Sequence, residues 1–217
     1  GYREGIMIQY EKINDDLNLP IKLIRFEGEI GEPIHKHWHN SLEIVLPICG
    51  GQFAWIDGKY YKMYHESGQP LIINSRSIHS FESGRPRPYI GLALQINYKF
   101  LKQVYHNIDN VYFKQPDEEV AKMIKEQIFL INQYYESEST NKELLIYSAL
   151  YKLIYIMVDY LCAEKEIKVD LKSEKNKHRI TNIINYIDDH YQEELTIDTL
   201  SQVFKLSEGH LSKLFKD

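Results

Sequence analysis

Two histidines and a glutamate stand close together in this sequence, at a spacing that suits a ligand site. They are His37, His39 and Glu43. Alternate residues of a strand point to one face, so this spacing predicts that all three side chains point toward the interior of a β domain. Imidazole and carboxylate groups that converge in this way suit Mn, Fe, Ni or Zn. The same groups can instead hydrogen-bond one another or a bound small molecule without any metal.

Glycines flank this segment at both ends. The full pattern is Gly31-x5-His37-x-His39-x3-Glu43-x6-Gly50. It resembles the first motif of the cupin β-barrels, in which such a segment contributes ligands to the barrel interior. The resemblance therefore implies a barrel around the three polar side chains.

A second segment, from Gly68 to His79, resembles the second cupin motif. The resemblance places His79 at the fourth ligand position. Three residues depart from the metal-binding pattern: Asn74 stands where that motif has Pro, Arg76 where it has Gly, and Ser83 where it has Asn. These departures weigh against a cupin enzyme but leave the barrel intact.

We interpret the four side chains as the lining of an effector pocket, in which a metal can be accommodated but is not required: His37, His39, Glu43 and His79. No nucleophile, phosphate-binding loop or further acid–base pair stands out elsewhere. The sequence gives no reason to assign a catalytic residue, a cofactor or a bound metal. A cupin metalloenzyme, a dioxygenase or isomerase with a helical tail for assembly, is the alternative.

Residues 1–114 have the pattern of an antiparallel β domain. Short segments rich in branched and aromatic residues are separated by Gly, Pro, Asn and Ser. Asp57-Gly58 predicts a two-residue hairpin turn between Phe53–Ile56 and Lys59–Tyr61. Many short strands without an intervening helix indicate a sandwich or barrel, here a cupin-like one.

Residues 115–163 have a helical period instead. Apolar residues recur every three or four positions from Val120 to Tyr135, and a second helix follows Asn141. That second helix is apolar nearly all round and must be buried, either by another helix of this chain or by a symmetric partner. We favour the partner, which predicts a homodimer through one stripe of the helix: Tyr147, Leu150, Ile154 and Met157.

Composition and charge exclude several classes of protein. Hydrophobic residues make up 43% of the 217 residues, and 26 basic against 31 acidic residues give a net charge of −5. That mixture is globular and is not a polybasic coat for nucleic acid or lipid. The longest apolar stretch is interrupted by Lys152 and Asp159, so we expect no membrane span. Cys49 and Cys162 have no disulfide or CxxC spacing, which favours a reducing, cytoplasmic location.

The C-terminal part carries a second motif. Residues 164–177 are dominated by charged side chains and are predicted to be a linker. In 178–217, Thr196 can cap one helix and Ser207 another after a short break, the spacing of a helix-turn-helix. The segment from Thr196 to Lys216 resembles the first half of the AraC-type DNA-binding domain, through these residues: Leu200, Leu206, Ser207, Leu211, Ser212, Leu214, Phe215 and Lys216.

The resemblance assigns DNA contacts to the last helix. It places Gly209, Ser212 and Lys213 toward the bases, with Ser207 and Lys216 suited to phosphates. Lys205 stands where the family frequently has Gly, which predicts backbone strain in the turn.

Two features oppose tight DNA binding by this sequence alone. From residue 178 onward there are four Lys or Arg against seven Asp or Glu, and phosphate neutralisation dominates DNA affinity. The family's domain also has a second helix-turn-helix, and the sequence ends before it. We therefore expect a truncated DNA-binding domain that binds weakly.

The order of barrel, helices, charged linker and helix-turn-helix is that of an AraC-type transcriptional regulator. The resemblance implies a non-enzymatic, ligand-responsive regulator that binds DNA as a homodimer. It also implies a small effector in the barrel, for which a sugar is one candidate. It does not name the effector, the operator, or the direction of regulation.

Overall fold

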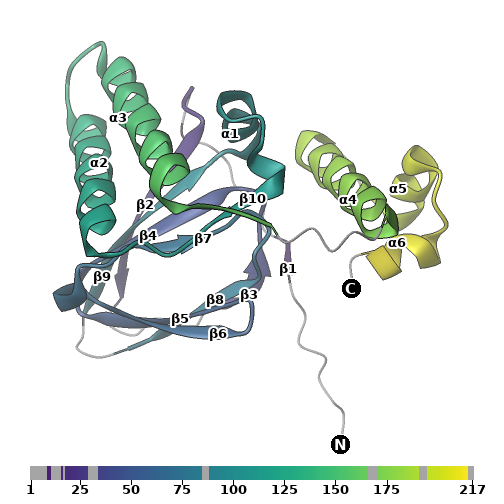
Figure 1. Ribbon diagram of the computed structural model, residues 1–217, viewed down its shortest axis with the longest axis horizontal. Helices are drawn as coiled ribbons and strands as arrows, with labels where there is room; N and C mark the ends of the chain where they lie inside the picture. The colour runs from purple at the N-terminus through teal and green to yellow at the C-terminus, as the bar shows by residue number, and fades with distance from the viewer. Residues whose placement is uncertain are drawn as a thin grey trace, which may run out of the picture. The chain divides into compact units, whose positions relative to one another are not determined.

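The computed structural model describes residues 9–10, 16, 18–28, 34–84, 88–165, 171–190 and 195–214. The chain forms two compact units, Gly1–Lys165 and Glu166–Asp217. The first unit contains the β domain with its helices, and the second is helical (Figure 1).

Two sheets build the β domain of the first unit. One has the order β1-β3-β8-β5-β6 and the bounds β1 (Gln9–Tyr10), β3 (Ile34–Trp38), β8 (His79–Ser83), β5 (Gly51–Ile56) and β6 (Lys59–Tyr64). The other has the order β2-β9-β4-β7 and the bounds β2 (Ile21–Gly28), β9 (Tyr89–Ile96), β4 (Leu42–Cys49) and β7 (Leu71–Ile73). All described pairs are antiparallel except β1 with β3. The sheets face each other (Figure 1), which confirms the predicted antiparallel, cupin-like class.

The hairpin between β5 and β6 forms as predicted. Asp57 and Gly58 have φ angles of 47° and 89°. Both angles are positive, as a two-residue hairpin turn of the type favoured by Asp-Gly requires.

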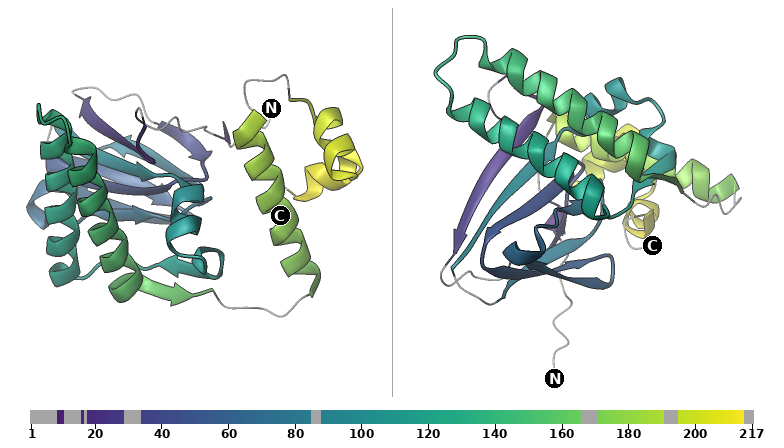
Figure 2. Two further views of the ribbon diagram at one scale, coloured as in Figure 1. Left: turned by 90° about the horizontal axis from the view of Figure 1, so that it is seen from above. Right: turned by 60° about the vertical axis from the view of Figure 1, so that its left-hand side comes forward.

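Helices cover the outer face of the second sheet. They are α1 (Tyr98–Val104), α2 (Glu118–Glu136), α3 (Lys142–Ile156) and the π-helical turn η3 (Met157–Leu161) that continues α3. Both views of Figure 2 show α2 and α3 against this sheet. The predicted helix of 117–135 is thereby confirmed, and the Asp117 side chain caps it by accepting a hydrogen bond from the Val120 amide at 2.9 Å.

The predicted dimer stripe lies in the core of this chain. Leu150, Ile154 and Met157 are 0%, 3% and 1% exposed and belong to one apolar cluster with α2 and the outer face of the sheet. Tyr147 is half-buried, with its ring beside Phe100. Leu150, Ile154 and Met157 have no surface left for a partner, so the stripe was wrongly assigned to the dimer: these three side chains pack in the core shared with α2 and the sheet.

Helix α3 together with η3 spans Lys142–Leu161. By length and composition alone, this segment could cross a membrane. Its buried residues, however, are part of the core shared with α2 and the sheet. That packing explains the apolar composition without a bilayer.

The second unit consists of α4 (Leu171–His190), α5 (Ile197–Phe204) and α6 (Glu208–Leu214). Ile183, Leu200 and Leu211 form its core, one from each helix. Helix α4 begins within the predicted linker of 164–177, because Lys and Glu are good helix formers even where no apolar stripe marks a helix.

Both predicted caps of the helix-turn-helix are present. The Thr196 hydroxyl accepts a hydrogen bond from the Thr199 amide at 3.1 Å, and the Ser207 hydroxyl accepts one from the His210 amide at 3.2 Å. Lys205 between α5 and α6 has a φ of 53°, in the left-handed region, and the Leu206 amide closes the turn on the Ser201 carbonyl at 3.0 Å. The strain expected at Lys205 is therefore confirmed, since the turn needs a conformation that glycine adopts without cost.

We predict that Lys205→Gly stabilises the second unit by about 1 kcal/mol, because it removes the Cβ clash of a left-handed residue. Hydrogen exchange of the α5 amides measures this free energy locally. Lys205→Ala is the matched control, since it removes the charge but keeps the Cβ. Equal protection in the glycine and alanine variants would show that the turn is unstrained.

Candidate functional site

The four residues predicted to share a pocket are brought together from both sheets of the barrel. His37 and His79 lie directly opposite each other on the paired strands β3 and β8. His39 follows β3, and Glu43 reaches the cluster from β4 in the facing sheet. The cluster (His37, His39, Glu43 and His79, called the His/Glu cluster below) thus joins the two sheets.

Glu43 lies at the centre of the His/Glu cluster. Its Oε2 atom is 2.9 Å from His39 Nε2 and 3.3 Å from His79 Nε2. All three side chains are buried. Burial raises the pKa of the Glu43 carboxyl, but hydrogen bonds and charge from His39 and His79 outweigh it and lower the pKa to about 2.

Backbone carbonyls orient the three imidazoles. His37 Nδ1 is 2.8 Å from its acceptor, the carbonyl two residues earlier in β3; His79 Nδ1 is 2.9 Å from the Ser77 carbonyl; and His39 Nδ1 is 3.0 Å from the Ser41 carbonyl. With Nδ1 donating to a carbonyl, Nε2 is the ring atom left for Glu43 or for a ligand, and it would be the electron-pair donor to a bound metal, as in metal-binding histidines.

The donor set fits a divalent transition metal. One ring nitrogen from each of the three histidines lies within 4.8 Å of the other two, and the ionised Glu43 carboxylate is adjacent. Nitrogen donors with a carboxylate are the ligands that Zn, Fe, Mn or Ni take in proteins. These residues could hold such an ion, or a ligand that hydrogen-bonds to the same atoms.

Sequence reasoning missed Gln95 at this site. It lies on β9 opposite Glu43 of β4, and its buried Oε1 has no hydrogen-bond partner among the described parts of the chain. A buried amide oxygen normally has a partner. The signal was available: Gln95 is the one polar residue in the apolar run Leu92–Ile96.

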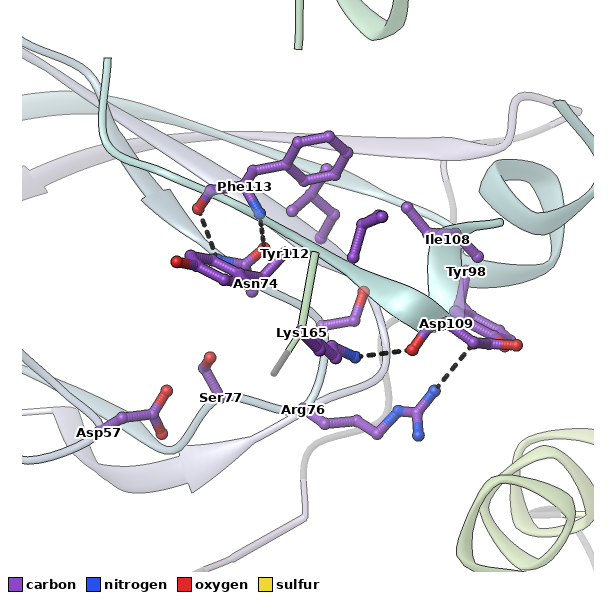
Figure 3. Close-up of a pocket in the computed structure, with 13 residues that line it drawn as sticks. Asp57, Asn74, Arg76, Ser77, Tyr98, Ile108, Asp109, Tyr112, Phe113 and Lys165 are labelled. Atoms are coloured by element: carbon purple, nitrogen blue, oxygen red, sulfur yellow. Dashed lines mark hydrogen bonds and ion pairs between the residues drawn. The ribbon is translucent and has the colours of Figure 1, made fainter. Parts of the chain in front are cut away.

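A polar cavity of about 250 Å³ lies apart from the His/Glu cluster (Figure 3). The turn between β7 and β8 forms one wall, with Asn74 and Arg76, and β10 (Val111–Phe113) forms another. Asp109 and Lys165 complete it. Sequence reasoning missed this cavity as well, because its residues are far apart along the chain and form no motif.

The predicted DNA contacts are described only in part. Ser207 and Gly209 are exposed at the beginning of α6, and a Cβ added at Gly209 would meet nothing within 4 Å. The backbone of Ser212 and Lys213 continues α6, but their side chains lie outside the description, and Lys216 lies outside the described residues.

Comparison with known proteins bears on both units. No family model matches the chain. The chain is 22% identical over 191 residues to the HTH-type transcriptional regulator YdeC of Bacillus subtilis strain 168, covering 83% of this chain and 64% of YdeC. It is 28% identical over 95 residues to the lactose operon transcription activator of Staphylococcus xylosus, covering 44% and 32% of the two chains.

The chain is related to the HTH-type transcriptional regulators. It spans less than two thirds of the length of both relatives. Both are named as regulators and not as enzymes.

A solved structure shares its fold. ToxT from Vibrio cholerae O395 superimposes with a TM-score of 0.53 at 10% identity, covering 91% of this chain and 74% of ToxT. The AraC-like transcriptional activator CuxR has a TM-score of 0.43 at 11% identity, with coverages of 82% and 61%. The resemblance of the sequence to HTH-type transcriptional regulators is thereby confirmed.

We predict that Glu43 contributes stability that depends on pH. A carboxyl whose pKa is lower in the folded than in the unfolded protein stabilises the fold at pH values above its ordinary pKa of 4.5. This stabilisation disappears as the pH falls toward about 2. Glu43→Gln should therefore be less stable than the wild type near neutral pH, by on the order of a few kcal/mol. The difference should shrink below pH 4.5.

The difference in the free energy of unfolding is measured by urea titration with tryptophan fluorescence as the signal, because Trp38 and Trp55 both lie in the first unit. Glu82→Gln, an exposed glutamate on β8, is the matched control and should change stability little at any pH. A constant difference between wild type and Glu43→Gln across this pH range would contradict the ion-paired role.

Proposed function

We propose that this protein is a ligand-responsive, DNA-binding transcriptional regulator of the AraC type that acts in the cytoplasm and is not an enzyme. The observation that carries the proposal is the second unit: two short capped helices joined by a tight turn and packed on α4 through Leu200 and Leu211. That is the arrangement of a helix-turn-helix, whose second helix enters the major groove.

Helix α6 is the proposed recognition helix. Its N-terminal residues, including Ser207 and Gly209, are exposed. The family resemblance adds Ser212 and Lys213 for base contacts and Lys216 for a phosphate. Lys213 suits guanine, because its ammonium donates to the acceptors that guanine presents in the major groove.

We predict that protein expressed from the complete gene containing this sequence selects a defined consensus from random duplex DNA. Lys213→Ala should relax the preference at one base position, at a cost of about 1–3 kcal/mol. Lys205→Ala, in the turn, is the matched control and should keep the consensus. Failure to select any consensus, or an unchanged consensus in Lys213→Ala, would refute the assignment.

Residues 1–217 alone should bind the selected duplex weakly, since residues 178–217 carry four Lys or Arg against seven Asp or Glu. Their binding should fall steeply between about 50 and 200 mM salt. Tight, salt-resistant binding by these residues would contradict the charge argument.

The effector is proposed to bind in the barrel, and a sugar is one candidate. The relative from Staphylococcus xylosus is named for the lactose operon, which supports a sugar here by analogy. Gln95, with its unpartnered Oε1, and the polar atoms of the His/Glu cluster could hydrogen-bond sugar hydroxyls.

A divalent cation is the second candidate, and the cluster geometry favours it. The ring nitrogens lie within 4.8 Å of one another, and Glu43 already contacts two imidazoles. The three histidines are close enough to hold a single ion with Glu43 adjacent, whereas a sugar would have to separate His39 from Glu43. In this account the ion acts as a signal or a structural element and catalyses nothing.

We propose that the homodimer uses the outer face of α3 instead of its buried stripe. Leu144, Tyr151 and Tyr155 are 70%, 50% and 52% exposed and share that face at helical spacing. Large exposed apolar side chains gathered on one helix face are typical of a protein interface.

Tyr151→Glu with Tyr155→Glu should therefore give a monomer with an intact first unit, because two charges would be buried at the interface. Sedimentation velocity at micromolar concentration measures the change. Glu118→Lys with Lys122→Glu, which exchanges two exposed charges on α2, is the control and should leave a dimer. A wild-type protein that is already monomeric under these conditions would exclude the interface.

A further inference from the structure

The turn between β7 and β8, residues 74–78, is bonded to the His/Glu cluster at two points. The Arg76 amide donates a hydrogen bond to the His39 carbonyl at 2.9 Å. The Ser77 carbonyl lies 2.9 Å from His79 Nδ1. Because a hydrogen bond weakens when its length or angle changes, a displacement of either histidine acts on the turn.

Asn74, the first residue of this turn, holds a segment that lies outside the two barrel sheets. Its Oδ1 accepts a hydrogen bond from the Phe113 amide at 2.8 Å, and its Nδ2 donates one to the Phe113 carbonyl at 3.0 Å (Figure 3). Two residues of an antiparallel ladder exchange the same two bonds between their backbones. The Asn74 side chain thus takes the place of a strand beside β10.

A second side-chain amide repeats this arrangement in the opposite direction. Gln115 Oε1 accepts a hydrogen bond from the Ile72 amide at 2.8 Å, and Gln115 Nε2 donates one to the Ile72 carbonyl at 2.8 Å. Within the described residues, β10 pairs with β11 (Cys162–Glu164) and with neither barrel sheet. The two amides therefore connect β7 to β10 without strand pairing.

Strand β10 in turn holds the end of the first unit. Phe113 lies opposite Cys162 on β11. The Lys165 amide donates a hydrogen bond to the Asn110 carbonyl at 2.9 Å, and the first unit ends at Lys165. The chain therefore leaves this unit from a segment that is bonded to β10.

Asn74 is also one of the three departures from the metal-binding cupin motif. That motif has proline at this position, and the proline ring offers no hydrogen-bond donor or acceptor. With proline at residue 74, the backbone of Phe113, a residue that is 3% exposed, would lose both bonds. Unpaired polar groups in a buried backbone are costly. The asparagine therefore supplies a contact that the motif's own residue cannot make.

We propose that Asn74 is a positioning residue that couples the His/Glu cluster to β10, β11 and the point at which the chain leaves the first unit. The inference rests on the proposed function, because it takes the cluster to be the effector site. A ligand there replaces the contacts of His39 and His79 with Glu43, and the change reaches the turn through the two carbonyl bonds. Such coupling is measured by a cycle of variants.

Amide hydrogen exchange of this chain tests the coupling without any ligand. Arg76 reports on the turn, Lys165 on the end of the first unit, and Ile128 in α2 on global unfolding. Glu43→Gln disturbs the cluster and should raise the exchange rates of Arg76 and Lys165 at least about fivefold. With Asn74→Ala also present, it should still raise the rate of Arg76 but change that of Lys165 less than about twofold. The factor for Ile128 should be the same in both backgrounds.

Zn²⁺ provides the reverse measurement, because an ion bound at the cluster should slow exchange. The rates of Arg76 and Lys165 should fall at least about fivefold in the wild type. In Asn74→Ala, only the rate of Arg76 should fall. Exchange that is already fast can still be slowed, so this measurement separates lost coupling from a segment that is merely loosened.

Two further variants serve as controls. Asn141→Ala makes the same chemical change at an exposed asparagine just before α3 and should keep both responses of Lys165. Asn74→Asp keeps the acceptor for the Phe113 amide but cannot donate to the Phe113 carbonyl. It should lose the Lys165 responses, and it replaces Asn74→Ala if that variant does not fold.

Lys165 responses of equal size in the wild type and Asn74→Ala would overturn the proposal. Absence of any Lys165 response to Glu43→Gln in the otherwise unaltered chain would overturn it as well. A complete gene product whose DNA affinity ignores every ligand is a separate result. It would refute the proposed regulator, while the exchange cycle would still decide the coupling.

Discussion

Strand β4 is buried on both of its faces, and the rest of the first unit depends on that constraint. Ile44 and Leu46 point outward into the core shared with α2 and α3, while Val45 points inward into the barrel core. Glu43 has the same inward direction as Val45, so a carboxylate is carried into an otherwise apolar interior. A shift of one residue in pairing would exchange the two faces, so the register is strongly specified.

A buried carboxylate must be compensated, and this requirement organises the interior. Glu43 is contacted at 2.9 Å by His39, which follows β3, and at 3.3 Å by His79 from β8 of the other sheet. Each imidazole is fixed in turn by a backbone carbonyl. The polar cluster is therefore both a link between the sheets and a set of donors that can exchange their mutual contacts for a ligand. Removing one partner leaves the other buried and unpaired, which costs more than the contact itself contributes.

The sequence allowed several features to be predicted because each depends on local chemistry. The Asp57-Gly58 turn needs two positive φ angles, and the cap at Thr196 needs a side-chain acceptor. The His/Glu cluster followed from the cupin resemblance, but the alternation argument was wrong: His37 and Glu43 lie on β3 and β4 of facing sheets and do not share one strand. The helix-turn-helix followed from the same kind of spacing, with Ser207 as its second cap.

Other features depend on contacts that composition does not encode. An apolar stripe such as Leu150 and Ile154 shows that a helix face is buried but not whether this chain or a second copy buries it. The cavity at Arg76 joins residues that are distant in sequence, among them Asp109 and Lys165. No spacing rule connects such residues, so only the fold reveals the cavity.

In the function proposed above, a ligand in the barrel changes the affinity of the second unit for DNA. The most direct test is the affinity of the complete gene product for its selected duplex, measured after chelator treatment and again with Zn²⁺ or lactose added. We predict that one of the two changes the DNA affinity by at least about fivefold, and that His39→Ala removes the response. Equal DNA affinity with and without both additions would contradict the proposed linkage.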